Sequence, residues 1–539
     1  MSIEPAELAE HVEALTAELE PLVTAASSAY WEFNVTGEEH WEEESARLQT
    51  EIRKALSRPA DYALFDGAVR TPNGADPALL RQAVLLRNDM APNQLPHETI
   101  ERLVKLETSL EGSFNTFRAE LDGERVGENR IRAILETSDD LELRRRAWEA
   151  SKQVGPAVVE QLLELVELRN ASARELGFAN YYSMSFELDE LDEEDVFGTI
   201  ARVVEGSQEA YERYKGRLDA ELSSRFGVAL DELGPWHYSD PFFQEAPTVD
   251  LDLDRWFAGR SIEQLATRYF GTVGFDVTRI LARSDLYERD GKCQHAFCMD
   301  VDRKGDVRIL CNLTDSEYWA STMLHELGHG VYDEGIDPRL PYLLRTAAHT
   351  ITTEAVAMLF GRLTRSGAWL VRHTGMPAGE LAEVASRLDR SRIAQDLHTA
   401  RWVPVMAYFE RELYRDPTQD LNALWWDLVE RLQLVRRPGN RAAADSSHAD
   451  WAAKIHFSSS PAYYQNYLLG EVVASQLQAH LLAVTGGWER YVGSREVARF
   501  LVDRLFSLGR SVAWQDAVAY ATGTGVDVGP FLEELAGVW

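Results

Sequence analysis

The residues best suited to chemistry in this chain are two histidines and a glutamate in the run HELGH, at residues 325–329. On a helix, His325 and His329 are four residues apart and share one face, where two imidazoles can hold one Zn²⁺. Glu326 lies beside that face and can serve as the base that such a site needs. The run is typical of a zinc hydrolase. The alternative is a surface helix that carries two histidines and no metal.

A catalytic zinc needs a third protein ligand, and Glu354 is the strongest candidate. It lies in the next helical pattern, after a break at Pro341 that allows an antiparallel return of the chain. The residues that follow it, 355–359, are apolar. A carboxylate on so apolar a helix is costly to bury unless it is paired or bound to a metal. His349 is the competing candidate.

A second group of reactive side chains lies in the segment 454–467, KIHFSSSPAYYQNY. Tyr464 and Tyr467 are three residues apart at the start of a helical pattern and can face one way. Together with the lysine and histidine of this segment they could donate hydrogen bonds to a developing oxyanion. A polar loop followed by an aromatic helix cap is the alternative.

The elements that must position these residues are mostly helices, because apolar residues recur at three- and four-residue spacing over most of the 539 residues. The helical patterns cover 6–27, 38–57, 76–89, 94–121, 139–178, 191–226, 261–272, 320–333, 345–366, 378–415, 420–435, 461–484, 493–507 and 514–537. The exception is a pair of short β-prone runs, 295–300 and 307–312, which predict a hairpin just before the HELGH helix. An open strand edge there could bind an extended peptide, and a purely structural hairpin is the alternative.

Composition narrows the class of protein. The net charge of −33 favours solubility and argues against nucleic acid or an anionic membrane as partner. Three cysteines form no disulfide framework, although a pair between Cys293 and Cys311 stays open. The N-terminus lacks the apolar core of a signal peptide, and no run approaches the roughly 18 apolar residues of a membrane span. We expect a cytoplasmic protein whose oligomeric state the sequence leaves open.

HELGH, Glu354 and the segment 454–467 together resemble the angiotensin-converting-enzyme (peptidyl-dipeptidase A) family of zinc metallopeptidases. The resemblance runs in order over about 140–485 and extends to Trp148-Glu149, Gln294-His295-Ala296 and Trp425-Trp426. The thimet oligopeptidase and oligoendopeptidase family is the next nearest.

The resemblance implies one Zn²⁺ per chain. Its ligands would be His325, His329 and Glu354. Glu326 would be the general base, and His456 and Tyr467 would stabilise the oxyanion.

The same resemblance implies how a short peptide would be held. His295 and Ala296 would bind its backbone, and Lys454 and Tyr464 would bind its terminal carboxylate. Tyr463 is a rival for Tyr464, because the two segments align only with one residue inserted.

Two positions depart from the family's pattern. The family has an aspartate four residues after the ligand glutamate, where it orients the first zinc histidine, and here that residue is Met358. Because a metal-bound imidazole normally needs such an acceptor, another group must hold His325 or metal binding is weaker. The family's glutamine that shares the terminal carboxylate has no match within 236–238, which leaves open whether release from the C-terminus is strict.

The resemblance implies a mainly α fold: a large two-lobed helical metallopeptidase with a deep central groove and a small β-hairpin beside the zinc helix. We expect one metallopeptidase domain over 1–539, in which 1–135 forms a lid of helices and 136–539 forms two catalytic lobes flanking the groove. The expected activity is cleavage of short peptides near the C-terminus, as in a dipeptidyl carboxypeptidase. The alternatives are an oligoendopeptidase of the same fold and a catalytically silent, zinc-containing scaffold that binds peptides.

Overall fold

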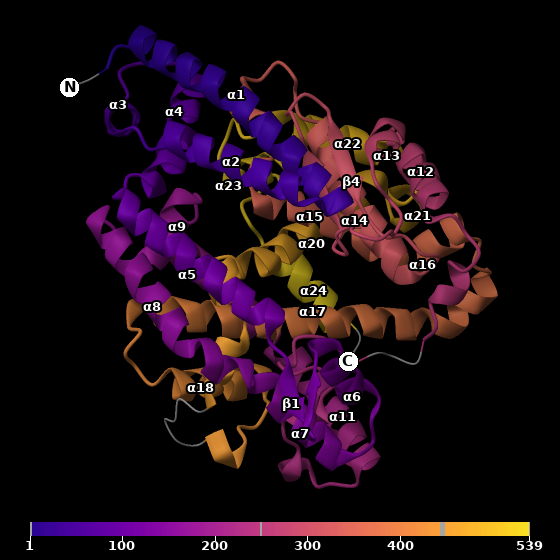
Figure 1. The fold of residues 1–539 in the computed structure, drawn as a ribbon. Coiled ribbons are helices and arrows are strands. Elements are labelled where there is room, and N and C mark those ends of the chain that lie inside the picture. The colour runs from indigo at the N-terminus through magenta and orange to yellow at the C-terminus, as the bar shows by residue number, and fades with distance from the viewer. Residues whose placement is uncertain (1–2, 248–250, 442–447, 538–539) are drawn as a thin grey trace. The chain divides into compact units, whose positions relative to one another are not determined.

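The computed structural model describes residues 3–247, 251–441 and 448–537, and most of them are helical (Figure 1). The expected mainly α fold is confirmed. Within the described residues the strands form two small antiparallel sheets. The strands are β1 (Ala119–Leu121) paired with β2 (Glu124–Val126), and β3 (Phe297–Asp300) paired with β4 (Val307–Leu310).

The chain divides into two compact units, each built from separate stretches of sequence. Unit 1 comprises the described parts of 1–94, 251–388 and 469–531. Its helices are α1 (Pro5–Thr36), α2 (Glu39–Leu56), α3 (Pro59–Arg70), α4 (Pro77–Met90), α12 (Ile262–Val273), α13 (Thr278–Arg283), α14 (Glu317–Glu334), α15 (Thr350–Gly361), α16 (Gly367–Trp369), α21 (Trp488–Tyr491), α22 (Glu496–Arg504) and α23 (Trp514–Thr522). Within this unit α14 packs along α15, and the β3–β4 hairpin packs against α14.

Unit 2 comprises the described parts of 95–250, 389–468 and 532–539. Its helices are α5 (His97–Thr116), α6 (Glu128–Thr137), α7 (Leu141–Lys152), α8 (Val154–Glu175), α9 (Tyr181–Leu188), α10 (Glu193–Gly206), α11 (Gln208–Phe226), α18 (Leu421–Gln433) and α19 (His456–Ser459). Three of the unit boundaries fall inside helices, namely α17 (Ala378–Arg415), α20 (Gln465–Thr485) and α24 (Gly529–Ala536). The deep groove and the lid stay predictions.

Several helical patterns match one helix each, whereas those over 139–178, 191–226 and 514–537 each cover two helices. The pattern over 378–415 coincides with α17, and the predicted hairpin is β3–β4. The patterns did not predict the short elements α3, α6, α9 and α13 or the β1–β2 pair.

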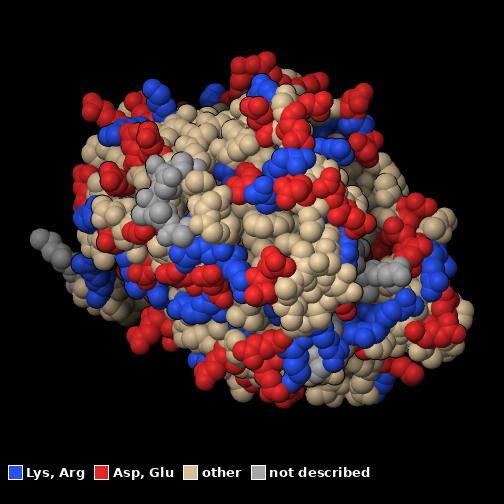
Figure 2. Space-filling model, turned by 90° about the horizontal axis from the view of Figure 1, so that it is seen from below, with Lys and Arg blue, Asp and Glu red and all other residues tan. Residues whose placement is uncertain are grey.

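None of the described helices combines the length and apolarity needed to cross a bilayer. Acidic and basic side chains lie interspersed over the face drawn in Figure 2. The acidic excess is therefore not gathered into one block on that face.

Candidate functional site

Helix α14 carries the HELGH run and is fixed at its start. The Ser316 hydroxyl caps the helix by accepting a hydrogen bond from the Trp319 N–H. The buried Glu317 carboxylate accepts hydrogen bonds from Thr364 and Arg365, which follow α15. The first turn of α14 is thereby tied to the end of its neighbour.

Helix α15 lies very close to α14 because residue 328 has no side chain. A Cβ at Gly328 would lie 2.7 Å from the Ala357 Cα, inside the backbone of α15. His349 caps the start of α15, where its Nδ1 accepts a hydrogen bond from the Ile351 N–H at 3.0 Å. This packing places Glu354 opposite the HELGH run and assigns His349 a structural role.

The structure brings His325, His329 and Glu354 together, with one ligand atom of each within 4.8 Å of the others. Glu354 Oε2 lies 3.6 Å from His325 Nε2 and 3.9 Å from His329 Nε2. Donor atoms around a tetrahedral zinc, each ~2.0–2.1 Å from the metal, are about 3.3 Å apart. The three donors therefore fit one metal ion after a small inward shift. No other such cluster of His, Cys, Asp or Glu occurs among the described residues.

The protonation of the two histidines also suits a metal. Burial lowers the pKa of His325 to about 4 and that of His329 to about 3, so both imidazoles are neutral at pH 7. His329 Nδ1 lies 2.7 Å from Thr353 Oγ1, which leaves Nε2 facing Glu354. Burial, together with nearby Glu471, raises the pKa of Glu354 to about 7, and a bound cation would favour its ionised form.

His325 has no hydrogen-bond partner among the described residues. Its ring packs edge to face on that of His329, with the centroids 4.9 Å apart, and its Nε2 lies 3.6 Å from Glu354 Oε2. Met358, at the position of the family's aspartate, lies with Sδ against Gly470, 3.2 Å from where a Cβ would be. The departure noted in the sequence therefore leaves the imidazole without a described acceptor.

Glu326 is buried beside strand β3, whose Cys298 N–H donates to its carboxylate. Burial and the nearby Glu354 raise the pKa of Glu326 to about 8. Glu326 and His325 form part of the wall of a hollow of about 360 Å³, which His295 and Ala296 also line. The two residues expected to hold a substrate backbone thus lie next to the HELGH run.

Unit 2 contains the second set of candidate residues, centred on Lys454. Its buried amine donates to Gln244 Oε1 at 3.0 Å and lies 4.8 and 5.1 Å from the ring centroids of Phe242 and Trp402. Burial lowers the pKa of Lys454 to about 8. Residues 236–238 contain no glutamine, and the glutamine beside Lys454 is Gln244, which the spacing did not single out.

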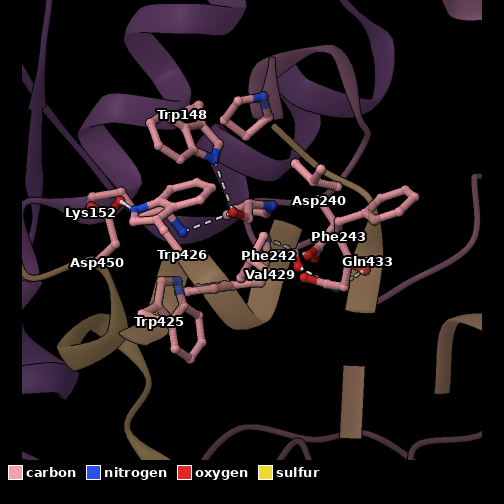
Figure 3. Close-up of a pocket in the computed structure, with 13 residues that line it drawn as sticks. Trp148, Lys152, Asp240, Phe242, Phe243, Trp425, Trp426, Val429, Gln433 and Asp450 are labelled. Atoms are coloured by element: carbon pink, nitrogen blue, oxygen red, sulfur yellow. Dashed lines mark hydrogen bonds between the residues drawn. The ribbon is translucent and has the colours of Figure 1, made fainter. Parts of the chain in front are cut away.

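The segment that carries Gln244 is held by side chains from two helices, α7 and α18 (Figure 3). Trp148 Nε1 and Lys152 Nζ both donate to the residue 241 carbonyl, at 3.0 and 2.8 Å. Gln433 Nε2 donates to the next two carbonyls, at 3.1 and 2.8 Å. The cavity inside this frame is about 20 Å³, room for about one water. These hydrogen bonds hold residues 240–244 in place, and the cavity is too small to be a substrate site.

The aromatic residues of this set pack edge to face. Tyr464 OH accepts a hydrogen bond from Trp402 Nε1 at 3.2 Å, and its ring centroid is 4.9 Å from that of His456 and 5.5 Å from that of Tyr467. Burial lowers the pKa of His456 to about 4, so its imidazole is neutral at pH 7. Tyr463 is less buried and packs on Tyr467, so the geometry favours Tyr464 as the phenol linked to the lysine through Trp402.

An HExxH helix joined to a glutamate on the next helix is the donor set of a metallopeptidase. The family model described as angiotensin-converting enzyme matches residues 3–229 and 253–535, nearly the whole chain. This chain belongs to that family of metallopeptidases. Comparison with curated proteins gives no match.

Proposed function

We propose that this chain is a zinc-dependent peptidase that acts on short peptides, preferentially near the C-terminus, as a dipeptidyl carboxypeptidase of the cytoplasm. The observation that carries the proposal is the donor set of His325, His329 and Glu354 beside the buried Glu326. A zinc ion held there would polarise the scissile carbonyl.

The chain's own groups would do the remaining work. The Glu326 carboxylate, whose ionised form a bound zinc ion would favour, would take a proton from the attacking water and return it to the leaving amine. His456 and Tyr467 donate hydrogen bonds to the oxyanion. His295 and Ala296 hold the substrate backbone at the start of the hairpin.

Lys454 would bind the terminal carboxylate of the peptide. A lysine amine is a compact charge suited to a single carboxylate. Gln244 orients the amine through its Oε1, and its amide nitrogen is held at 3.3 Å from the buried Asp240 carboxylate. Tyr464 would add a phenol donor.

The first experiment removes the base and keeps the metal donors. Glu326→Gln should retain zinc, measured by atomic absorption, and lose about 10²–10⁴-fold in peptide hydrolysis. Glu334→Gln, an exposed glutamate on the same helix, is the matched control and should cleave like wild type.

Two results would count against the proposed reaction. Zinc-loaded Glu326→Gln that cleaves at the wild-type rate would exclude this mechanism. Wild-type protein with a full complement of zinc that cleaves no member of a mixed peptide library would leave a peptide-binding scaffold as the function.

The second experiment separates the carboxypeptidase from an oligoendopeptidase. Asp240 favours the endopeptidase, because its charge already partly neutralises Lys454. Peptides with free C-termini should be cleaved faster than their amides, and Lys454→Met should remove about 10–100-fold of that advantage. Lys105→Met, an exposed lysine of the same unit, is the control. Equal rates for free and amidated peptides would indicate the endopeptidase.

A further inference from the structure

Part of the hollow beside the HELGH run is lined by residues that have no role in the reaction described above. Its volume is about 360 Å³, at the small end of the ~300–1,000 Å³ range of ligand pockets, enough for one large side chain. Four of its lining residues are Gln294, Tyr318, Ser321 and Thr322. All lie in unit 1, as does the metal cluster.

Two of these residues, Tyr318 and Thr322, continue the face of α14 that carries His325. Tyr318, Thr322 and His325 follow one another at spacings of four and three residues, so their side chains lie on one side of the helix. A side chain that enters the hollow therefore lies beside a metal donor. The hollow is suited to the substrate residue that flanks the scissile bond.

The hydroxyl groups of the residues that line the hollow already donate their hydrogens elsewhere, so they can serve a ligand only as acceptors. Ser321 Oγ donates its hydrogen to the Gly361 carbonyl at 3.0 Å, and Thr322 Oγ1 donates its hydrogen to the Tyr318 carbonyl at 2.9 Å. Each oxygen keeps lone pairs and has no second hydrogen to offer. Gln294 uses its nitrogen on the Lys292 carbonyl at 3.3 Å, which leaves Oε1 as a further acceptor.

The electrostatics of the wall point the same way. None of the described residues that line the hollow is a lysine or an arginine. The Tyr318 ring is 66% exposed and can lie against a cation. An acidic side chain would lose its hydration here and gain no hydrogen bond, because the wall offers it only acceptors. An ammonium or guanidinium group could donate hydrogen bonds to the same acceptors.

We propose that this hollow binds the side chain next to the scissile bond and selects lysine or arginine there. The proposal rests on the proposed peptidase function and adds its side-chain preference. Tyr318 and Thr322 are then specificity-determining residues, and Ser321 and Gln294 assist them.

The test uses two series of peptides that differ only in the residue on one or the other side of the cleaved bond, carrying Lys, Leu or Glu. At one of the two positions kcat/KM should fall in the order Lys, Leu, Glu, with at least about tenfold between Lys and Glu for one charged hydrogen bond. Thr322→Val, which keeps the shape and removes the acceptor, should lower the Lys-to-Leu ratio about five- to tenfold.

Thr272→Val is the matched control. Thr272 lies on α12 of the same unit, is half-buried like Thr322, and makes the same bond to the carbonyl four residues earlier, but it does not line the hollow. Its Lys-to-Leu ratio should equal that of wild type. Tyr318→Leu, which removes the ring and keeps an apolar side chain, should also lower the ratio.

Binding separates failure of this inference from failure of the proposed function. Fluorescence anisotropy with zinc-loaded Glu326→Gln measures the Kd of the Lys and Glu peptides whether or not any peptide is cleaved, and the Lys peptide should bind more tightly. Equal Kd values, or zinc-dependent hydrolysis with no order at either position, would overturn the preference and leave the peptidase intact. If zinc-loaded wild-type protein hydrolysed no peptide while the Lys peptide still bound more tightly than the Glu peptide, the proposed peptidase function would be wrong. The cation-selective hollow would then stand.

Discussion

His325 is the metal donor that the rest of the chain supports least. The ring of His329 meets Thr353 Oγ1, whereas the ring of His325 has no hydrogen-bond acceptor of this kind among the described residues. An acceptor beside a metal-bound imidazole fixes its tautomer and its orientation. The chain has Met358 at the place where its family has an aspartate for this purpose.

Met358→Asp should therefore tighten zinc binding, by about tenfold if the new carboxylate accepts a hydrogen bond from His325 Nδ1. Competition with a chromophoric chelator measures the zinc Kd directly. Met358→Leu keeps the volume without an acceptor and should leave the Kd unchanged. An aspartate variant that binds zinc no better than wild type would show that packing already orients His325 fully.

At this scale the sequence predicted residues whose spacing along one helix defines their geometry. His325 and His329 share a face by helical period, and an apolar helix indicated that Glu354 needed a partner. Gln244 could not be found in this way. Its contact with Lys454 depends on the folded path of residues 240–244, which side chains from distant helices hold in place.

Among the elements, the contact between α14 and α15 determines whether the metal donors meet. Gly328→Ala would place a methyl group 2.7 Å from the backbone of α15 at Ala357. The helices must separate, so the variant should lose about 1–3 kcal/mol of unfolding free energy and bind zinc more weakly. Urea unfolding of the metal-free protein and a zinc titration measure the two effects.

Gly271→Ala is the matched control for that change, because Gly271 lies inside α12 of the same unit and a Cβ there meets nothing within 4 Å. It should stabilise the protein by about 0.5–1 kcal/mol, since alanine loses less backbone entropy than glycine on folding. Gly328→Ala with wild-type stability and zinc affinity would mean that the two helices do not need this close approach.

The long amphipathic helices and the β3–β4 hairpin were predictable because their apolar residues repeat at the helical or strand period. The pattern over 378–415 has the same limits as α17. Helix α9 was not predictable in this way, because its eight residues present fewer than three turns of periodic pattern. Its start depends instead on Asn180, whose side chain accepts the Ser183 N–H.

For the whole molecule, motif order along the chain predicted the family, and the family model matches nearly every residue. The division of the chain into two units could not be derived from local patterns. Each unit is assembled from three separate stretches, and three of the boundaries between them lie inside the helices α17, α20 and α24. No change in composition marks such a boundary.

Each unit also buries an acid that should affect the pH dependence of stability. Burial raises the pKa of Asp333 in unit 1 to about 8, helped by Asp300 and opposed by Arg303. Burial raises the pKa of Glu410 in unit 2 to about 8, although the Ala462 N–H and Arg169 oppose it. Both acids therefore hold a proton in the folded state at neutral pH, whereas in the unfolded chain they release it near pH 4.

The sign follows from proton binding. Between pH 5 and 7 the folded state binds the proton and the unfolded state does not, so each acid lowers the unfolding free energy by up to about 1.4 kcal/mol per pH unit as the pH rises. Glu410→Gln and Asp333→Asn carry no titrating proton, so the stability of each variant relative to wild type should increase from pH 5 to pH 7. Other titrating groups are common to variant and wild type and cancel in this difference.

Urea unfolding of the metal-free proteins at pH 5, 6 and 7 measures the effect. Asp337→Asn is the control, because hydrogen bonds from Arg339 lower the pKa of that carboxyl to about 2 and it stays ionised in both states over this range. Its relative stability should be independent of pH. If the relative stability of Glu410→Gln and Asp333→Asn were also independent of pH, Glu410 and Asp333 would be ionised in the folded protein. Charges other than those named above would then have to offset their burial.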